Sequence, residues 1–293
     1  MPTSILPARS HAKNPSDFRD FVPCSPIVKW AGGKGRLLHQ LTQRLPEGAE
    51  YKRHIEPFAG GAALFFAHAP KRAMLCDVNP ALIHAYQSVR DAVEDVIVEL
   101  QRLAKRHSTI HYYQVREQYN QSRQVLNTEH AARFIYLNKT CFNGLHRVNR
   151  QGEFNVPLGR YSNPRIIDEE NLREASRRLK RVQLECMDFR DLPTIGRDED
   201  FFYLDPPYAP ISATANFTSY SLAGFSWQDQ TELGDVFRAL DSKGAKLMLS
   251  NSDVPLIHRI YEGYRIERIL APRAINCKGE ARRPVPELII RNY

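Results

Sequence analysis

The stretch that decides the fold is Phe201-Phe202-Tyr203-Leu204-Asp205-Pro206-Pro207-Tyr208. Its first four residues form a short apolar run rich in aromatic side chains, which predicts a buried strand. The two prolines end this strand, because proline has no N–H group to donate to a neighbouring strand. The side chains that follow are therefore expected at the carboxyl end of a sheet, where open α/β sheets bind their ligands.

The chemistry of residues 205–208 suits the 6-amino group of an adenine. That amine is a poor nucleophile, because its lone pair is delocalised into the ring. The Asp205 carboxylate and the Pro206 carbonyl can accept hydrogen bonds from the amine and draw it towards tetrahedral geometry, and Pro207 offers no competing N–H donor. Tyr208 presents a flat face on which a base can stack. The alternative is an ordinary turn, since Asp and Pro are common turn residues, and the tetrapeptide alone leaves both interpretations open.

The composition is that of an ordinary globular protein with a polyanionic partner. Hydrophobic residues make up 42% of the 293 and charged residues 25%, which is enough to build a buried core. The formal net charge of +8 favours a partner such as nucleic acid. The five cysteines are scattered and odd in number, which argues against a zinc or redox motif and against a disulfide framework, so we expect no metal. No apolar run is long enough to span a bilayer, and we expect a cytoplasmic protein that acts as a monomer.

A glycine-rich turn, Trp30-Ala31-Gly32-Gly33-Lys34, precedes leucines at helical spacing. Such a turn at the start of a helix directs free N–H groups and the positive end of the helix dipole towards a carboxylate. Lys34 can pair with that carboxylate, and Trp30 can cover an apolar or cationic ligand. The spacing before the lysine differs from that of a phosphate-binding P-loop. A tight turn with a solvated lysine is the alternative.

Further strand ends carry the pattern of a nucleoside site. Residues 54–66 are expected to form a strand end, a glycine turn and a buried helix, and the next strand, Ala73 to Asp77, ends in an acid. In doubly wound sheets the glycines allow a ligand to approach and the acid binds the ribose hydroxyls. Asp77 could alternatively cap the next helix, and both roles could hold at once. A third strand is followed by Asp188 and Phe189. Asp188 could accept from the amino group of a cofactor's adenine, with Phe189 beside the ring, or it could equally be a helix cap.

Between these motifs the chain is expected to form an insertion that contacts nucleic acid. Residues 81–141 carry apolar residues at helical spacing, and the polar stretch 111–124 is interpreted as helix surface without a specific role. Residues 137–161 contain Asn-Gly and Gln-Gly turn signals and predict a hairpin or an extended loop. Its exposed polar side chains are expected to be Asn143, His146, Arg147, Asn149, Arg150, Asn155, Arg160 and Tyr161. Arg and Asn read base edges and the others can hold phosphates, so nucleic-acid contact is favoured over a plain polar surface loop.

The remaining segments are expected to lie outside the core. Residues 1–26 are rich in Pro and Ser with few apolar residues and predict a poorly ordered, flexible extension. Residues 211–226 are rich in Ser, Thr and Ala and predict a mobile loop near the site. Residues 274–283 carry basic side chains between late strands and suit phosphate contacts.

The motifs of this chain, taken together, resemble those of the DNA adenine methyltransferase (Dam) family, the D12 class in the alpha group of adenine-specific DNA methyltransferases. They are KWAGGK at 29–34, EPFAGG at 56–61, Asp77, the run NGLHRVNRQGEFNVPLGRY at 143–161 and DPPY at 205–208. The resemblance implies an α/β fold: a Rossmann-like, doubly wound methyltransferase sheet with a helical and β-hairpin target-recognition insertion. The catalytic domain would comprise residues 27–84 and 165–293, and the DNA target-recognition insertion residues 85–164.

The resemblance further implies a site-specific DNA (adenine-N6)-methyltransferase that uses S-adenosyl-L-methionine and acts on double-stranded DNA. The target adenine is expected to flip out of the duplex, because its amine is out of reach in the stack. The catalytic motif would be Asp205, Pro206, Pro207 and Tyr208. Trp30, Lys34, Asp77 and Asp205 would contact the cofactor, and its pocket would be shaped by Ala31, Gly32, Gly33, Glu56, Phe58 and Gly60.

In this family the hairpin motif is associated with GATC-type sites. Positions that read or flank such a site match Lys29, Arg147, Pro157 and Tyr161, and the other expected DNA contacts are Asn143, Asn149 and Arg160. The chain departs from the family at Ala62, which replaces the last glycine of F-x-G-x-G, and at residues 276–280, which are less rich in glycine. The alternatives are an RNA adenine methyltransferase on the same scaffold and a non-catalytic DNA-binding relative.

Overall fold

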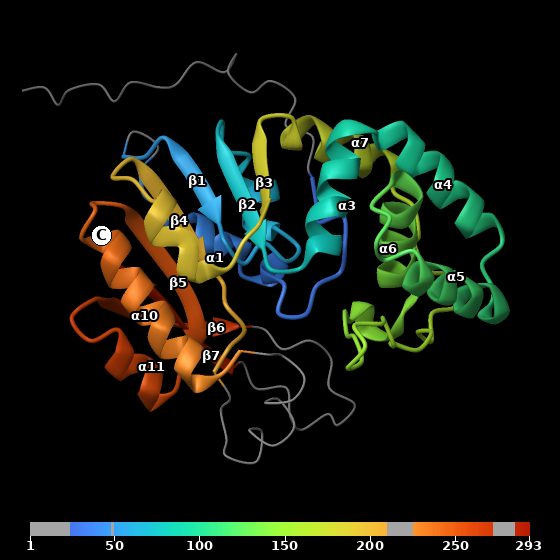
Figure 1. Cartoon of the computed structure of the whole chain (residues 1–293). Coiled ribbons are helices and arrows are strands. Elements are labelled where there is room, and N and C mark those ends of the chain that lie inside the picture. The colour runs from blue at the N-terminus through green and yellow to red at the C-terminus, as the bar shows by residue number, and fades with distance from the viewer. Residues whose placement is uncertain (1–23, 48–49, 210–224, 272–284) are drawn as a thin grey trace, which may run out of the picture.

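A seven-stranded sheet forms the centre of the structure, a computed structural model that describes residues 24–47, 50–209, 225–271 and 285–293 (Figure 1). The strand order is β3-β2-β1-β4-β5-β7-β6. The parallel strands are β1 (Arg53–Glu56), β2 (Ala73–Asp77), β3 (Val182–Cys186), β4 (Asp200–Leu204) and β5 (Lys246–Ser252). Antiparallel pairing adds β7 (Val285–Arg291) to β5 and β6 (Arg265–Ala271) to β7. The expected α/β fold with a mostly parallel, Rossmann-like sheet is therefore confirmed.

Helices cover the sheet and form a second group beside it (Figure 1). Those associated with the sheet are η2 (Lys34–Arg36), α1 (Leu38–Thr42), α2 (Ala63–His68), α3 (Pro80–Asp91), α7 (Glu169–Leu179), η4 (Phe189–Asp191), α8 (Leu192–Ile195), α10 (Trp227–Asp241) and α11 (Pro255–Ile260). The second group contains α4 (Val93–Lys105), α5 (Thr109–Gln121), α6 (Thr128–Thr140) and η3 (Phe142–Gly144). Because α3 runs across residue 84, where the sequence placed the start of the insertion, one helix belongs to both parts.

The strand order reverses between β1 and β4, and this reversal places the site. From β1 the sheet continues to β2 and β3 on one side and to β4 and β5 on the other. Ile55 of β1 is paired with Met74 of β2 and with Phe202 of β4. The carboxyl ends of these strands therefore lie side by side, and open α/β sheets bind ligands at such a switch point.

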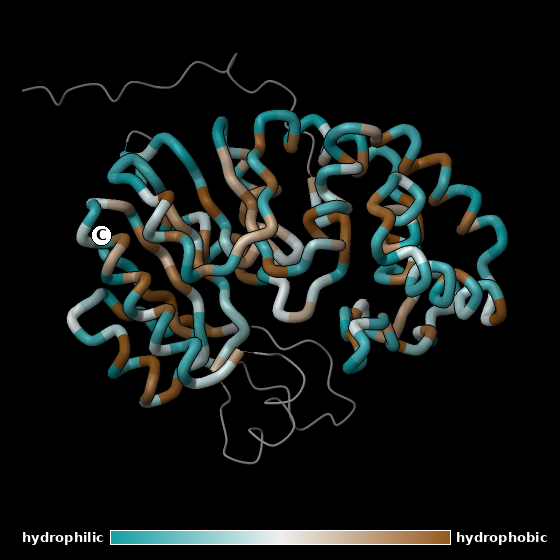
Figure 2. Tube along the Cα trace, in the orientation of Figure 1, coloured by the Kyte–Doolittle hydropathy of each residue, from teal (hydrophilic) through white to brown (hydrophobic). Residues whose placement is uncertain are grey.

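Apolar side chains cover both faces of the sheet. In β4, Phe202 and Leu204 pack with Phe237 of α10, while Phe201 and Tyr203 belong to the cluster on the opposite face. This alternation follows from the two-residue repeat of a strand, and burial of both faces accounts for the continuous apolar run. Figure 2 shows apolar stretches running through the sheet, with hydrophilic residues at turns along its upper edge.

The core continues from the sheet into the helical insertion. Leu75 of β2, Tyr86 of α3 and Ile97 of α4 belong to one apolar cluster, which also contains Tyr112 of α5. The helical insertion therefore shares its core with the part of the chain that contains the sheet. None of the helices in the described ranges combines the length and the apolar character needed to cross a membrane.

A loop closed at two places follows α6, where the sequence predicted a hairpin or extended loop. Antiparallel bridges join Cys141 to Leu158 and Val148 to Phe154, without longer ladders between them. We call residues 141–161 the recognition loop. Gly144 in this loop has φ +63°, and a Cβ there would lie 2.4 Å from Cβ of Lys29, so only glycine fits against the segment that carries Lys29.

The segments expected outside the core lie largely outside the described residues. Of the predicted flexible extension, residues 24–26 are described, and they pack on the protein: the Ser25 N–H donates to Oδ1 of Asn171 at 2.8 Å, and Asn171 Nδ2 donates back to the Ser25 carbonyl at 2.9 Å. The predicted mobile loop, except residues 225–226, and the whole basic segment 274–283 lie outside the described residues.

Candidate active site and nucleic-acid interface

An ion pair joins the glycine-rich turn to the end of β4. Nζ of Lys34 lies 2.6 Å from Oδ1 of Asp205, and the two side chains are 7% and 19% exposed. Lys34 also donates to the Gly32 carbonyl at 2.7 Å, and Ser250 Oγ, at the end of β5, donates to the same Asp205 oxygen at 2.6 Å. Oδ1 is therefore occupied by two protein donors. The alternative of a solvated lysine is wrong, because Lys34 is buried against this carboxylate.

Buried amides and a hydroxyl fix the backbone of the turn after β4. Gln230 of α10 donates to the Pro207 carbonyl at 2.8 Å. Asn251 accepts from the Ala209 N–H at 3.1 Å, and Ser252 donates to the Ala209 carbonyl at 2.6 Å. Sequence reasoning assigned no role to these three side chains. For Asn251 and Ser252 the available signal was a run of polar residues at the end of the buried strand β5, whereas no such signal marked Gln230.

Two acceptors of the turn are not engaged by any residue that the structure describes. Within the described parts of the chain, no donor reaches Oδ2 of Asp205 or the carbonyl oxygen of Pro206. These are the acceptor groups expected to receive the amine of an adenine. The rigid turn thus offers a carboxylate oxygen and a carbonyl at the carboxyl end of the sheet.

Tyr208 stands next to the ion pair and is half-buried rather than part of the core. Its hydroxyl donates to Oε2 of Glu287 at 2.7 Å, and Nζ of Lys34 lies 4.6 Å from its ring centroid. Burial, together with the nearby Asp205 carboxylate, raises the pKa of Tyr208 well above its ordinary value. The phenol is therefore neutral and acts as a positioned aromatic ring.

The second half of the site is built around Gly60. Its φ is +46°, and a Cβ there would lie 2.6 Å from Cδ1 of Trp30, so the indole lies directly against the glycine backbone. The Gly60 N–H donates to Oδ2 of Asp77 at 3.0 Å, and the Asn79 N–H donates to Oδ1 at 3.0 Å. Asn79, not Asp77, caps α3, accepting from the backbone N–H groups at the start of that helix. The alternative role of Asp77 as the cap is thereby excluded.

These contacts fit a nucleoside-containing cofactor such as S-adenosylmethionine. Burial raises the pKa of Asp77, and each of its oxygens accepts one backbone N–H, which leaves lone pairs for ribose hydroxyls. Glycine at position 60 leaves room for the Trp30 indole, which supplies an aromatic surface beside Asp77. The Gly33 N–H donates to the Trp30 carbonyl at 3.1 Å, so one turn carries both Trp30 and Lys34. The two halves of the site are therefore continuous.

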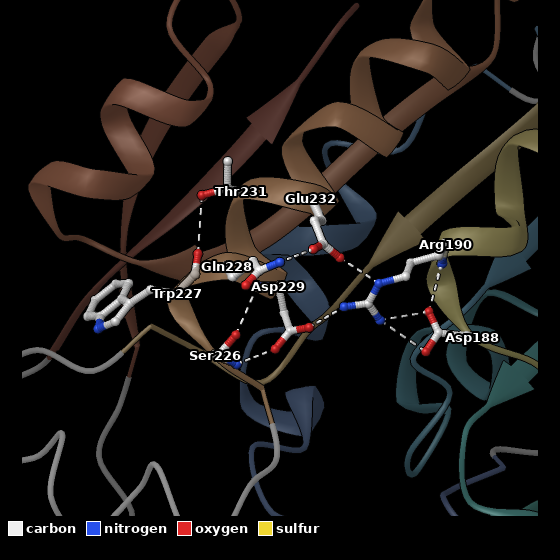
Figure 3. Close-up of polar contacts among 8 residues, drawn as sticks. All are labelled: Asp188, Arg190, Ser226, Trp227, Gln228, Asp229, Thr231 and Glu232. Atoms are coloured by element: carbon white, nitrogen blue, oxygen red, sulfur yellow. Dashed lines mark hydrogen bonds and ion pairs between the residues drawn. The ribbon is translucent and has the colours of Figure 1, made fainter.

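Asp188 is engaged by Arg190, as Figure 3 shows. Oδ1 of Asp188 accepts from the backbone N–H of Arg190 at 2.9 Å and from its guanidinium at 3.1 Å, and so caps η4. The same guanidinium contacts Asp229 and Glu232 at the start of α10. The helix-cap alternative thus describes the observed geometry, and acceptance from a cofactor's adenine stays a prediction.

The other residues predicted to shape the pocket lie on both sides of the β1 end. Phe189 is buried, and its ring centroid lies 5.7 Å from that of Phe58 and 5.5 Å from that of Phe225. These rings form an apolar wall next to Asp188. Glu56 is buried and pairs within β1, its Oε1 lying 2.8 Å from Nε2 of His54.

The recognition loop contacts the segment before the glycine-rich turn at Lys29. Nζ of Lys29 lies 4.0 Å from the ring centroid of Tyr161 and donates to the Lys139 carbonyl at 3.1 Å. Buried Asn138 exchanges hydrogen bonds with the backbone of Lys29, both at 2.7 Å, and also donates to the Gly144 carbonyl. Lys29 and Tyr161, which are distant in the chain and were both predicted to read or flank the DNA site, are thus brought together.

The other predicted DNA contacts divide into exposed and internal side chains. Asn143, Arg147, Pro157 and Arg160 are exposed. Asn149 instead stabilises its own turn, its Oδ1 accepting from the N–H groups of Gln151 and Glu153 and its Nδ2 donating to the Glu153 carboxylate. A base contact from Asn149 therefore stays a prediction.

The position of His146 differs from the one that the sequence predicted for it. It was expected among the exposed polar side chains, but its ring stacks on Trp30 with centroids 5.8 Å apart and packs against Phe134 and Phe154. Burial lowers the pKa of His146 to about 4, so the ring is neutral near pH 7. Turn signals show where the chain reverses but not which side chains fold inwards, which is why sequence reasoning missed this contact.

Comparisons with known proteins identify the family that this chain matches. Residues 30–275 match the family described as D12 class N6 adenine-specific DNA methyltransferase. The chain is 42% identical to the type II methyltransferase M.MjaIII of Methanocaldococcus jannaschii over 285 residues, which cover 92% of this chain and 99% of that protein. It is 41% identical to the type II methyltransferase M1.LlaDCHI of Lactococcus lactis subsp. cremoris, with coverage of 92% and 95%. It is 33% identical to the DNA adenine methylase of Escherichia coli (strain K12), with coverage of 90% and 93%.

Proposed function

The chain belongs to the D12 class of N6 adenine-specific DNA methyltransferases, and we propose that it methylates N6 of adenine at GATC-type sites in double-stranded DNA. The observation that carries the proposal is the acceptor pair of the β4 turn, Asp205 Oδ2 and the Pro206 carbonyl. Both are fixed by surrounding hydrogen bonds and lie at the switch point of the sheet.

The amine of the target base is the group that this pair would hold. Hydrogen bonds to Asp205 and Pro206 would turn the nitrogen lone pair away from the ring system and towards an electrophile. Tyr208 would stack on the base, since its ring is held by Glu287 and Lys34. The gain comes from orientation and local electrostatics, without a covalent intermediate on the protein. An adenine inside a duplex cannot reach this turn, so the base would be flipped out.

S-adenosyl-L-methionine would supply an electrophilic methyl group on its sulfonium. The residues that would hold it are the turn from Trp30 to Lys34 and the pair Gly60 and Asp77, with Asp205 adjoining both the cofactor and the base. Asp77 would accept from ribose hydroxyls, and Trp30 would cover the ligand. Phe58, Phe189 and Asp188 would lie towards the adenine end.

Duplex DNA would lie against the insertion and the recognition loop. We assign residues 27–84 and 165–293 to catalysis and residues 85–164 to target recognition. Arg147 would read a base edge, Lys29 and Tyr161 would act as one unit at the junction, and Asn143, Pro157 and Arg160 are exposed on the same loop.

Sequencing of methylated adenines tests the proposal. The chain is expressed in cells without adenine methylation, and methylated positions are mapped in their DNA. We expect N6-methyladenine at one short sequence of GATC type, and none with Asp205→Ala. Purified protein is then given duplex DNA and RNA with labelled cofactor. Transfer to RNA alone would favour the RNA methyltransferase alternative, and no transfer to either by the wild type would favour the non-catalytic one.

A further inference from the structure

One face of α5 holds the backbone of the recognition loop. Tyr112, Arg116 and Asn120 follow at intervals of four residues and therefore share a face of the helix. The Tyr112 hydroxyl donates to the Val156 carbonyl at 2.9 Å, and Arg116 reaches the same oxygen at 3.4 Å. The polar stretch that was interpreted as plain helix surface is thus the support of the loop expected to read DNA.

The side-chain amide of Asn120 hydrogen-bonds the backbone of Phe154 as a neighbouring strand would. Its Nδ2 donates to the Phe154 carbonyl at 3.1 Å, and its Oδ1 accepts from the Phe154 N–H at 2.8 Å. One side-chain amide therefore satisfies both backbone groups of a residue that is only 3% exposed. The backbone at Phe154 is fixed both in position and in the direction of its peptide planes.

The next residue connects this anchor to the predicted base-reading arginine. Asn155 Oδ1 accepts from Nε of Arg147 at 2.7 Å, and the Asn155 N–H donates to the Arg147 carbonyl at 3.1 Å. Asn155 lies between Phe154 and Val156, and α5 holds the carbonyls of both. α5 thus holds the backbone on both sides of Asn155, and the Asn155 side chain holds the guanidinium of Arg147. The direction of that guanidinium therefore depends on α5.

Arg123 ties the tip of the loop to the same anchor. Its Nη1 donates to the Gln151 carbonyl at 2.6 Å, and its Nε donates to the Asn120 carbonyl at 2.9 Å. Gly152 follows in the left-handed region with φ +75°, and a Cβ there would lie 3.2 Å from Nη1 of Arg123. The arginine thus fits against a turn that glycine alone adopts easily.

We propose that Asn120 and Arg123 are positioning residues that determine sequence specificity by holding Arg147 in its base-reading direction. The proposal rests on the proposed function and adds to it. A planar guanidinium discriminates bases only when both of its hydrogen bonds are aligned, so a loop that shifts by a fraction of an ångström loses discrimination before it loses affinity. Phosphate contacts elsewhere on the insertion would still hold the DNA.

The test compares cognate and altered sites. The cognate sequence is the one that the wild type methylates in cells, and each altered duplex changes one base pair of it. The ratio of kcat/KM on cognate to altered duplex is measured for the wild type, Asn120→Ala, Arg123→Ala and Arg123→Lys. The matched control is Gln118→Ala, which removes an exposed amide from the same helix. Single-turnover rates at saturating cognate DNA are recorded for each protein.

We expect the ratio to fall roughly 10- to 100-fold in Asn120→Ala, while the single-turnover rate stays within about threefold of the wild type. Arg123→Ala should show a smaller fall that Arg123→Lys partly restores, because lysine can still donate to the Gln151 carbonyl. Gln118→Ala should match the wild type. If Asn120→Ala does not fold, the two Arg123 variants decide the matter.

An unchanged ratio in the folded variants overturns the inference, whether or not their rate falls, because a merely structural role would lower activity equally on every duplex. Failure of the proposed function looks different: the wild type would then methylate no defined sequence, and no cognate site could be chosen.

Discussion

Gln230 donates a hydrogen bond from its side-chain amide to the carbonyl oxygen of Pro207 at 2.8 Å. Its Oε1 in turn accepts from Nδ2 of Asn251 at 2.9 Å, and Asn251 holds the N–H of Ala209. Gln230 is only 2% exposed. A buried relay from α10 to β5 thus fixes the peptide next to the Pro206 carbonyl, the acceptor that has no protein donor among the described residues.

Replacing Gln230 by leucine should lower kcat with little effect on KM. The substitution leaves the Pro207 carbonyl and the Asn251 amide without their partner, so the turn loses its fixed direction. We expect kcat to fall roughly 10- to 100-fold, the size of effect that small misplacement of reacting groups produces. Steady-state kinetics with saturating cofactor and DNA measure this. Gln228→Leu, an exposed glutamine of the same helix, is the control, and equal kcat values for both variants would contradict the prediction.

The ion pair between Lys34 and Asp205 predicts an unusual stability pattern. Removing one partner leaves the other charge poorly compensated in a largely buried place, so Lys34→Met should lower the free energy of unfolding by about 3 kcal/mol. The double variant Lys34→Met with Asp205→Asn should be at least as stable as the Lys34→Met variant. All of these variants should lose methyl transfer.

Urea unfolding monitored by fluorescence measures these differences. The comparison pair is Lys52 with Glu199, whose side chains are 68% and 50% exposed. Lys52→Met should change the free energy of unfolding by less than about 1 kcal/mol, since exposed pairs contribute little. A double variant less stable than the Lys34→Met single variant would show that the buried pair is not coupled in this way.

Gly60→Ala should weaken cofactor binding more than it weakens the fold. A Cβ at this position meets Trp30 at 2.6 Å, and the left-handed φ of +46° adds strain of about 1–2 kcal/mol for alanine. Because the indole stacks on His146, it cannot move away without disturbing the recognition loop. Isothermal titration with S-adenosylhomocysteine should show a Kd raised at least tenfold. Gly35→Ala is the control, since a Cβ there meets nothing within 4 Å; the same Kd for both variants would refute the assignment of the pocket.

The sequence could predict the strand end and the turn because their signals are local. The apolar run before Asp205 and the acid after β2 mark strand ends by themselves, and parallel strands bring their carboxyl ends together. The direct pairing of Lys34 with Asp205 could not be predicted in this way. The two residues are distant in the chain, and each was expected to contact a ligand separately.

Local sequence signals also could not predict which polar side chains pair with which partners in the folded protein. Asn120 resembles any polar residue on an exposed helix, and its role appears only when Phe154 is brought beside it by the folded loop. Gln230 gives no sign in the sequence that it faces inwards, although its burial follows once α10 packs on the sheet. Hydrophobic spacing identifies the faces of elements, whereas polar relays depend on the assembled geometry.

Burial of His146 predicts a loss of stability in mild acid. Its pKa is lowered from 6.5 to about 4 in the folded protein, so the unfolded chain binds a proton below pH 6.5 that the folded chain does not. The free energy of unfolding should therefore be highest above pH 6.5 and fall as the pH drops from 6.5 towards 4, by at most about 3 kcal/mol for this group. His68 and His130, whose pKa values burial also lowers to about 4, contribute in the same direction.

His146→Phe isolates the contribution of this residue to the pH dependence of the free energy of unfolding. Phenylalanine keeps the stacking on Trp30 but cannot titrate, so the variant should show a shallower fall in the free energy of unfolding between pH 7 and pH 5 than the wild type. Urea titrations at half-unit pH steps measure the two slopes, and His39→Phe, on the exposed side of α1, serves as the control and should keep the wild-type slope. Identical slopes for His146→Phe and the wild type would mean that His146 takes up a proton in the folded state as easily as in the unfolded chain, which would contradict the prediction.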